Sequence, residues 1–286
     1  MVNNIVNGVM GLCVADALGV PVEFNRRETL KENPVVGMRA YGTHNQPAGT
    51  WSDDTSMSLC LVDCLSEGLN YEDIMNKFVK WFDEGAYTPY GDAFDIGIAT
   101  SKALQRYMNG TKPLQCGGTT EYDNGNGSLM RILPILFYLQ SRNDFFEQDE
   151  AFDIIHNVSA LTHAHKRSQM ACGIYVSIAA KICEESNLVL AVEQGISYAM
   201  KYYKKRAEFE SELHYFQRLD NKNFASLPID QIKSSGYVID TLEAAIWCLL
   251  NTKSYKDCVL KAVNLGEDTD SLAAVVGGAS RTSLWL

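Results

Sequence analysis

The sequence lacks the features that mark several large classes of protein. Its eight cysteines include no Cys-X-X-Cys pair. Most fall on apolar helical stripes, as Cys60 and Cys64 do, so we expect reduced, buried thiols rather than a disulfide framework. No basic segment precedes the first apolar stretch, which Asp16 interrupts, and no run reaches the roughly 18–20 apolar residues of a membrane span. These absences predict a cytoplasmic protein without a signal peptide or a membrane partner.

Basic charge is also scarce. The net charge is −10, and the only dense basic run is 201–206, which we interpret as the solvated face of a helix. General nucleic-acid binding is therefore not expected. The sequence contains no Gly-Lys-Ser/Thr of a Walker loop, no Asp-Asp-X-X-Asp and no His-Asp dipeptide. These absences argue against a P-loop nucleotide site, a terpene-synthase-like site and an HD-type phosphohydrolase.

Apolar residues, by contrast, are plentiful and recur at helical spacing. They make up 46% of the 286 residues, which is ample for a substantial core. The first pattern runs from Asn4 to Leu18. Further helices are predicted over 54–68, 71–84, a segment reaching 107, 150–160, 166–184, 188–204, 207–219, 237–251 and 255–264. Residues 25–50 are read as a long irregular connection. With no convincing strand pair or repeat, we predict a single all-α domain over 1–286, acting as a monomer.

Two acidic clusters lie at the starts of predicted helices. Ser52-Asp53-Asp54-Thr55 and Gly266-Glu267-Asp268-Thr269-Asp270-Ser271 each run into an apolar stretch. Helix capping would explain one acid at each start but not the excess. Converging carboxylates repel one another unless cations intervene, and Asp with Ser or Thr oxygens suits Mg²⁺, Mn²⁺ or Ca²⁺ rather than Zn²⁺. We therefore predict that the clusters face each other and bind metal, with ordinary N-caps as the alternative.

Three further positions are candidates for ligand binding. Glu23 follows a Gly and Pro break after the first helix, where a loop carboxylate can reach inward; a solvated acid is the alternative. Gly-Asn-Gly-Ser at 125–128 precedes an apolar helix, so its glycines and free N–H groups could hold a phosphate, although a plain turn is the alternative. His163 lies at a helix junction, which suits either a ligand contact or a supporting role.

Taken together, these motifs resemble the ADP-ribosylglycohydrolase family, which includes the dinitrogenase-reductase-activating glycohydrolase. The resemblance covers almost the whole chain. It is carried by GVMGLCVADALGVPVEF, GTWSDDTSM, FDIGIATSKAL, NGNGSLMRILP, LTHAHKRS and GEDTDSLAAVVGG. It implies an all-helical fold with two Mg²⁺ or Mn²⁺ ions in a cleft. The implied reaction is hydrolysis of the N- or O-glycosidic bond between ADP-ribose and a modified side chain, through an oxocarbenium-like state.

The resemblance also implies roles for particular residues. Glu23 matches a mobile glutamate near the scissile bond, and Asp123 matches a loop position where some relatives carry a catalytic acid. The implied metal ligands are Ser52, Asp53, Asp54, Asp268, Asp270 and Ser271. The implied substrate contacts are Asn126, Gly127, Ser128, Met130 and His163.

Three departures from the family pattern bear on activity. Glu267 stands where many relatives have glycine, Ile98 replaces a commonly polar position, and 279–286 do not continue as relatives do. We interpret the C-terminal end as shortened, which would leave the last helix under-packed and the cleft partly open. A non-catalytic ADP-ribose binder of the same fold is therefore the competing hypothesis. The sequence leaves open which linkage is cut and which protein or small-molecule adduct carries the ADP-ribose.

Overall fold

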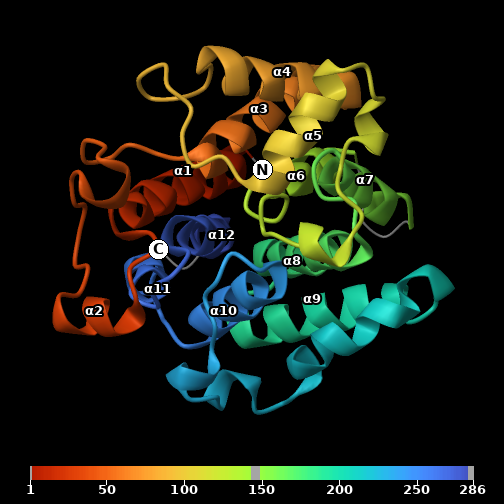
Figure 1. The fold of residues 1–286 in the computed structure, drawn as a ribbon. Helices are drawn as coiled ribbons and strands as arrows, with labels where there is room; N and C mark the ends of the chain where they lie inside the picture. The colour runs from red at the N-terminus through yellow and green to blue at the C-terminus, as the bar shows by residue number, and fades with distance from the viewer. Residues whose placement is uncertain (1, 143–148, 283–286) are drawn as a thin grey trace.

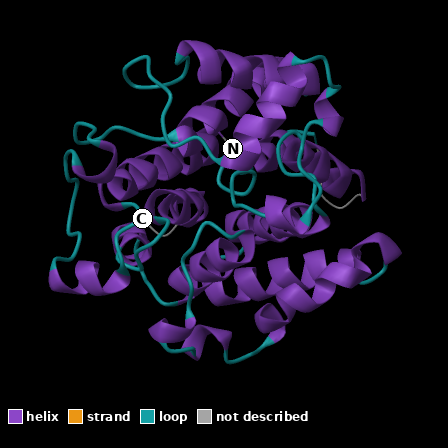
Figure 2. Ribbon diagram, viewed as in Figure 1, coloured by secondary structure: helices purple, strands orange, loops and turns teal. Residues whose placement is uncertain are grey.

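The computed structural model describes residues 2–142 and 149–282, and these residues form helices joined by loops (Figure 2). The α-helices are α1 (Val2–Gly19), α2 (Arg27–Glu32), α3 (Asp53–Glu67), α4 (Tyr71–Glu84), α5 (Ile98–Met108), α6 (Pro134–Gln140), α7 (Asp149–Ala160), α8 (Lys166–Glu184), α9 (Leu188–Tyr203), α10 (Val238–Leu250), α11 (Tyr255–Val263) and α12 (Thr269–Thr282). Short 3-10 helices are η1 (Val20–Val22), η2 (Gly42–His44), η3 (Pro113–Gln115), η4 (Glu121–Asp123), η7 (Phe224–Ser226) and η8 (Ile229–Gln231), and η6 (Ala207–Asp220) is longer. Within the described ranges there is no strand, only isolated bridges. The all-α prediction is confirmed.

The first and last helices lie side by side in the middle of the molecule (Figure 1). Their backbones come close because glycines face each other: a Cβ on Gly277 would lie 2.4 Å from the carbonyl oxygen of Gly11. A Cβ on Gly19 would likewise lie 2.4 Å from the Cα of Asp270. This contact joins the end of α1 to the start of α12, and so brings the loop after α1 next to the second acidic cluster.

Helix α8 is the other central element. It packs against α7, α9, α10 and α12, and its residues from Met170 to Ala180 are all buried. A helix that is apolar nearly all round requires neighbours on every side, and the apolar run at 171–182 predicts such a position. That prediction is confirmed.

Three local predictions are wrong. The connection at 25–50 contains a short α-helix and a 3-10 turn, and 207–219 forms a 3-10 segment rather than an α-helix. The Gly-Asn-Gly-Ser stretch does not open a helix, because residues 127–131 form turns and α6 begins only at Pro134. Proline lacks an N–H and has a fixed φ, so it suits the first turn of a helix better than its interior. The phosphate-binding idea for this stretch therefore loses its helix N-terminus.

Two predictions about the ends of the chain need comment. By length and composition alone, Asn4–Val22 could cross a membrane, contrary to the sequence-based expectation, although a buried core helix passes the same test and 61% of the tested window is buried. In α12, the residues from Leu272 to Ala279 are buried. The interpretation of a shortened end concerns residues 279–286, of which 279–282 complete α12 and 283–286 lie outside the described residues.

Candidate active site

The two acidic clusters meet where α3 and α12 begin. Ser52 is the N-cap of α3, its hydroxyl accepting from the N–H of Asp54, and Asp268 immediately precedes α12. The hydroxyl of Ser271 lies 3.4 Å from Oδ2 of Asp54, which joins the clusters across 217 residues of sequence. The fold therefore brings together the residues that the sequence places at two distant helix starts.

Three carboxylate oxygens at this meeting point are buried without a hydrogen-bond partner: Oδ1 of Asp54, Oδ1 of Asp268 and Oδ2 of Asp270. Burial, reinforced by neighbouring acids, raises the pKa of Asp54 and of Asp270 well above the usual range. Burial likewise raises the pKa of Asp268 to about 6. Unpaired buried acceptors cost free energy, and a cation would satisfy them and favour the ionised carboxylates. The donor set therefore fits a divalent metal ion.

The ligand atoms of these acids are close enough to share ions. In one group, Asp16, Asp54 and Asp270 each offer an oxygen, and all three oxygens lie within 4.8 Å of one another. In a second group, Glu23, His44, Asp95 and Asp270 satisfy the same condition. Asp270 belongs to both groups, so the geometry is compatible with more than one ion.

Asp16 is a member of the site that the sequence does not reveal. Its carboxylate accepts from the N–H of Ser52 at 3.0 Å and from the N–H and hydroxyl of Thr55 at 3.0 and 2.6 Å. Burial raises its pKa to about 6. Asp16 thus fixes the start of α3, where the first cluster lies. In the sequence, Asp16 is recognisable only as an interruption of the first apolar stretch.

A cleft of about 320 Å³ opens above the acids. It is lined by the predicted residues Glu23, Asp53, Asn126, Gly127, Met130, His163, Asp268 and Ser271, and by Phe24, Asp95, Gly97, Ile98, Ala99, Thr100, Tyr122, Gly125 and Gly236. Asp54, Asp270 and Ser52 lie behind this lining. Ser128 is also behind it, fully buried and within hydrogen-bond distance of Ser159 and Cys172. A direct contact between Ser128 and a substrate is therefore not supported.

The loop that carries Asn126 is tied to the second acidic cluster. The N–H of Asn126 donates to the carbonyl of Gly236 at 3.0 Å. Its side-chain amide lies 2.9 Å from both the hydroxyl of Thr241 and Oδ2 of Asp268. A Cβ on Gly127 would lie 2.9 Å from Cε1 of His163, so only glycine leaves the backbone room beside that ring.

His163 is buried beneath this loop and held in one orientation. Its Nδ1 lies 2.8 Å from the hydroxyl of Thr162, which accepts a hydrogen bond from Arg131 at 2.7 Å. Burial, together with the charge of Arg131, lowers the pKa of His163 to about 3. The ring is therefore neutral at physiological pH and suited to hydrogen bonding rather than to accepting a proton. Arg131, fully buried against Phe78, is a supporting residue that the sequence reasoning missed.

Glu23 lies at the other side of the cleft. Its side chain is buried, with 4% of the residue exposed, so the alternative of a solvated loop acid is wrong. Burial raises its pKa to about 8. Its Oε2 contacts Nε2 of His44, and this contact raises the pKa of His44. His44 is a second residue that the sequence reasoning missed, because it lies in the connection read as irregular.

The predicted catalytic role of Asp123 is not supported by its surroundings. Asp123 ends η4, and its Oδ2 accepts from the N–H and the hydroxyl of Thr120 at 3.0 and 2.6 Å. These hydrogen bonds, led by the one from the hydroxyl, lower the pKa of Asp123. It does not line the cleft, and a carboxylate with a lowered pKa is a poor proton donor. Asp123 therefore serves as a cap for its own turn.

The structure also accounts for two departures from the family pattern. Glu267 has a φ of 64°, which explains why glycine suits that position. Its N–H donates to the carbonyl of Asn25, and its own carbonyl accepts from Phe24, while the side chain is exposed. Ile98 is 75% exposed at the rim of the cleft. Neither residue adds a buried charge to the acidic cluster.

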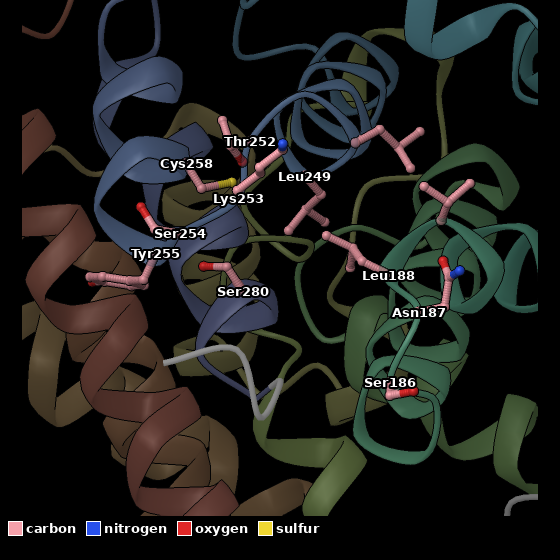
Figure 3. A pocket seen from close by; sticks show the side chains of 12 residues that line it. Ser186, Asn187, Leu188, Leu249, Thr252, Lys253, Ser254, Tyr255, Cys258 and Ser280 are labelled. Carbon is pink, nitrogen blue, oxygen red and sulfur yellow. The ribbon is translucent and has the colours of Figure 1, made fainter.

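A second, larger cavity of about 540 Å³ lies between α9, α10, α11 and the end of α12 (Figure 3). Leucines such as Leu188 and Leu249 line it, with Lys253 at its edge. No carboxylate is among its lining residues. It therefore has none of the chemistry of the acidic cleft.

The fold and the site define an all-helical protein with clustered buried carboxylates that could bind metal ions beside a cleft, and comparisons with known proteins identify the family. The model of the family described as ADP-ribosylglycohydrolase matches residues 2–280. The chain belongs to this family, whose members remove ADP-ribose from modified residues, and it is a hydrolase of this class.

Individual relatives agree with this assignment. The chain is 31% identical to the ADP-ribosylarginine hydrolase Tri1 of Pseudomonas putida (strain GB-1), over 94% of this chain and 67% of that one. It is 32% identical to the Tri1 protein of Serratia proteamaculans (strain 568), over 94% and 68%. A solved structure, an ADP-ribosylglycohydrolase-related protein complex, matches with a TM-score of 0.76 and 26% identity, covering 98% of this chain and 87% of that one.

Proposed function

We propose that the protein hydrolyses the N-glycosidic bond between ADP-ribose and an arginine side chain, with two divalent cations, Mg²⁺ or Mn²⁺, as cofactors. The observation that carries the proposal is the set of buried, unpaired oxygens on Asp54, Asp268 and Asp270. Asp270 shares one group of closely spaced ligand atoms with Asp54 and another with Glu23, and Asp268 lines the cleft. The similarity to two ADP-ribosylarginine hydrolases supports the arginine linkage.

The proposed ligands of the cations are the acidic clusters. Unpaired oxygens are available on Asp54, Asp268 and Asp270. Asp53 and Ser271 line the cleft. The hydroxyl of Ser52 donates a hydrogen bond to Oδ2 of Asp54 at 3.0 Å. Bound cations would supply Lewis-acid chemistry and fixed positions for ribose hydroxyls and for water.

Glu23 is the proposed proton donor. Burial raises the pKa of its carboxyl group to about 8 when no cation is bound, so this group holds a proton more readily than an ordinary glutamate does. It would give this proton to the leaving nitrogen of arginine as the bond to the anomeric carbon breaks. The resulting carboxylate would then accept a proton from the water whose oxygen adds to that carbon, which restores Glu23 and yields free ADP-ribose.

The loop at 125–130 and His163 are proposed to hold the rest of the substrate. Gly127 borders the cleft, and its lack of a side chain leaves room for the ring of His163. The neutral ring of His163 is fixed by Thr162, so its other nitrogen can exchange one hydrogen bond with the substrate. These groups orient the ribose next to Glu23 without carrying protons themselves.

The test is release of free ADP-ribose from ADP-ribosyl-arginine and ADP-ribosyl-serine peptides, each with Mg²⁺, with Mn²⁺ and with EDTA. We expect release from the arginine peptide only with metal, and none from the Asp54→Asn variant. A matched control is Asp63→Asn, which changes an exposed acid on the same helix. Release from the serine peptide alone would contradict the arginine linkage, and undiminished release in EDTA would contradict the metal dependence. Binding of ADP-ribose without any release would favour the non-catalytic binder.

A further inference from the structure

The loop at 41–46 is packed directly against the segment that carries Glu23. His44 contacts the Glu23 carboxylate through Nε2, and the hydroxyl of Thr43 donates to the backbone carbonyl of Glu23 at 2.6 Å. Gly42 comes so close that a Cβ there would lie 1.9 Å from the carbonyl oxygen of Pro21. Residues 42–44 of this loop therefore lie against the backbone of Pro21 and Glu23 and against the side chain of Glu23.

The loop itself has a fixed shape. Its ends are joined by an isolated bridge, with the N–H of Tyr41 donating to the carbonyl of Gln46. Tyr41 and Asn45 adopt φ values of 63° and 52°. Residues other than glycine rarely adopt positive φ values, and they keep them only where the surrounding structure holds the backbone in place. A loop with this conformation does not adapt freely to its neighbour, so it can act as a support.

The ring of His44 also lies near two aromatic rings. It lies 6.1 Å from the ring of Phe24 and 5.2 Å from that of Phe94, measured between ring centres. The Oδ1 of Asp95 is 3.9 Å from its Nε2. His44 does not line the cleft, whereas Glu23 does. Among the cleft residues near His44, Glu23 makes the hydrogen bond, whereas Asp95 and Phe24 lie farther from it.

We propose that His44 is a positioning residue that holds the Glu23 carboxylate toward the scissile bond. This inference rests on the proposed function, because it assigns a role within that reaction. A free glutamate samples several rotamers, and displacement of a catalytic group by about 1 Å can cost on the order of 100-fold in rate. The family resemblance implies a mobile glutamate; in this chain the 41–46 loop restrains it. His44 acts on turnover by limiting where the carboxylate can go.

Two substitutions separate the hydrogen bond from the packing. His44→Phe keeps a ring between Phe24 and Phe94 but removes the contact with Glu23, whereas His44→Gln keeps a side-chain N–H and removes the ring. We expect His44→Phe to lower kcat on the arginine peptide about 10- to 100-fold, with KM changed less than about 3-fold. We expect His44→Gln to recover most of the loss. The control is His214→Gln, which changes an exposed histidine whose Nδ1 lies 2.9 Å from the carbonyl oxygen of Ser211.

A double-mutant cycle shows whether the effect passes through Glu23. In a Glu23→Gln background, His44→Phe should cause no further loss, since coupled residues are non-additive. The melting temperature and the Kd for free ADP-ribose should stay at wild-type values. An undiminished kcat in His44→Phe, an equal loss in His44→Gln, or full additivity in the cycle would each overturn the inference.

A measurement that needs no turnover keeps the inference separate from the proposed reaction. Amide hydrogen exchange of the peptide covering residues 20–26 should be faster in His44→Phe than in wild type, and unchanged in His214→Gln. If wild-type protein releases no ADP-ribose from any peptide, the proposed function fails, and the exchange rates alone decide whether His44 restrains Glu23. Equal exchange in His44→Phe and wild type would refute the restraint.

Discussion

Replacing Asp268 by asparagine should stabilise the metal-free protein while it removes activity. Asp268 has one oxygen bonded to the amide of Asn126 at 2.9 Å and one oxygen with no hydrogen-bond partner. Asparagine has nearly the same shape, can keep the bond to Asn126 and adds an N–H donor beside acids that need one. It also removes a negative charge from a crowded, desolvated site. The same change deletes a proposed metal ligand, so two opposite effects on stability can be separated by the presence of metal.

The size of the effect follows from the pKa of Asp268, which burial raises from 3.8 to about 6. Each step of one in pKa is worth about 1.4 kcal/mol, so the penalty for full ionisation is at most about 3 kcal/mol. The folded protein keeps this proton to a higher pH than the unfolded chain does. The penalty is therefore absent below about pH 4, grows between about pH 4 and 6, and is complete above about pH 7. We expect Asp268→Asn to gain about 1–3 kcal/mol at pH 8.

The assay is thermal unfolding of wild type and Asp268→Asn at pH 4 and at pH 8, with EDTA or with Mn²⁺. In EDTA at pH 8 the variant should melt roughly 2–8 °C higher, and at pH 4 the difference should nearly vanish. Mn²⁺ at about 100 times its Kd should stabilise wild type by about 2.7 kcal/mol and the variant by much less. A variant that is less stable than wild type in EDTA at pH 8, or that gains as much as wild type from Mn²⁺, would refute the reasoning.

Two further substitutions test other parts of the site. Asp123→Asn should keep turnover within about 3-fold of wild type, because its carboxylate caps Thr120 outside the cleft and has a lowered pKa; a loss comparable with that of Glu23→Gln would restore its catalytic assignment. Gly42→Ala should lower the melting temperature and kcat together, because its Cβ would lie 1.9 Å from the carbonyl oxygen of Pro21 in a backbone with φ +64°; a variant with wild-type stability and kcat would show that the loop shifts without consequence.

The sequence was informative where the signal is local. Apolar periodicity located α3, α4 and α8 to within a residue at each end, and the clusters at 52–54 and 268–271 were found because excess acids at a helix start are visible in one short stretch. The residues that were missed act at a distance. Asp16 bonds to Ser52, Glu23 contacts His44, and Arg131 bonds to Thr162, over 36, 21 and 31 residues of sequence.

Those missed contacts depend on how helices pack, which periodicity does not determine. Asp123 illustrates a different limit. The resemblance assigns it a role because it occupies a loop position where some relatives carry a catalytic acid, yet it does not line the cleft. The bonds from Thr120 instead turn its carboxylate into a local cap. Contact with the cleft depends on which face of a turn a side chain occupies, and that direction changes from one residue to the next.

The position of the acids explains how one site can depend on both ends of the chain. Asp16 lies in α1 and Asp270 in α12, and the two helices pack with their backbones in close approach at Gly11, Gly19 and Gly277. A rigid pair of core helices fixes the distance between the carboxylates. On a flexible loop, the carboxylates would repel one another and move apart. The same rigidity prevents the acids from relaxing, so the metal-free protein keeps them protonated or under strain. Cation binding should therefore stabilise the contact between α1 and α12 as well as the site, and amide exchange in both helices should slow when Mn²⁺ is added.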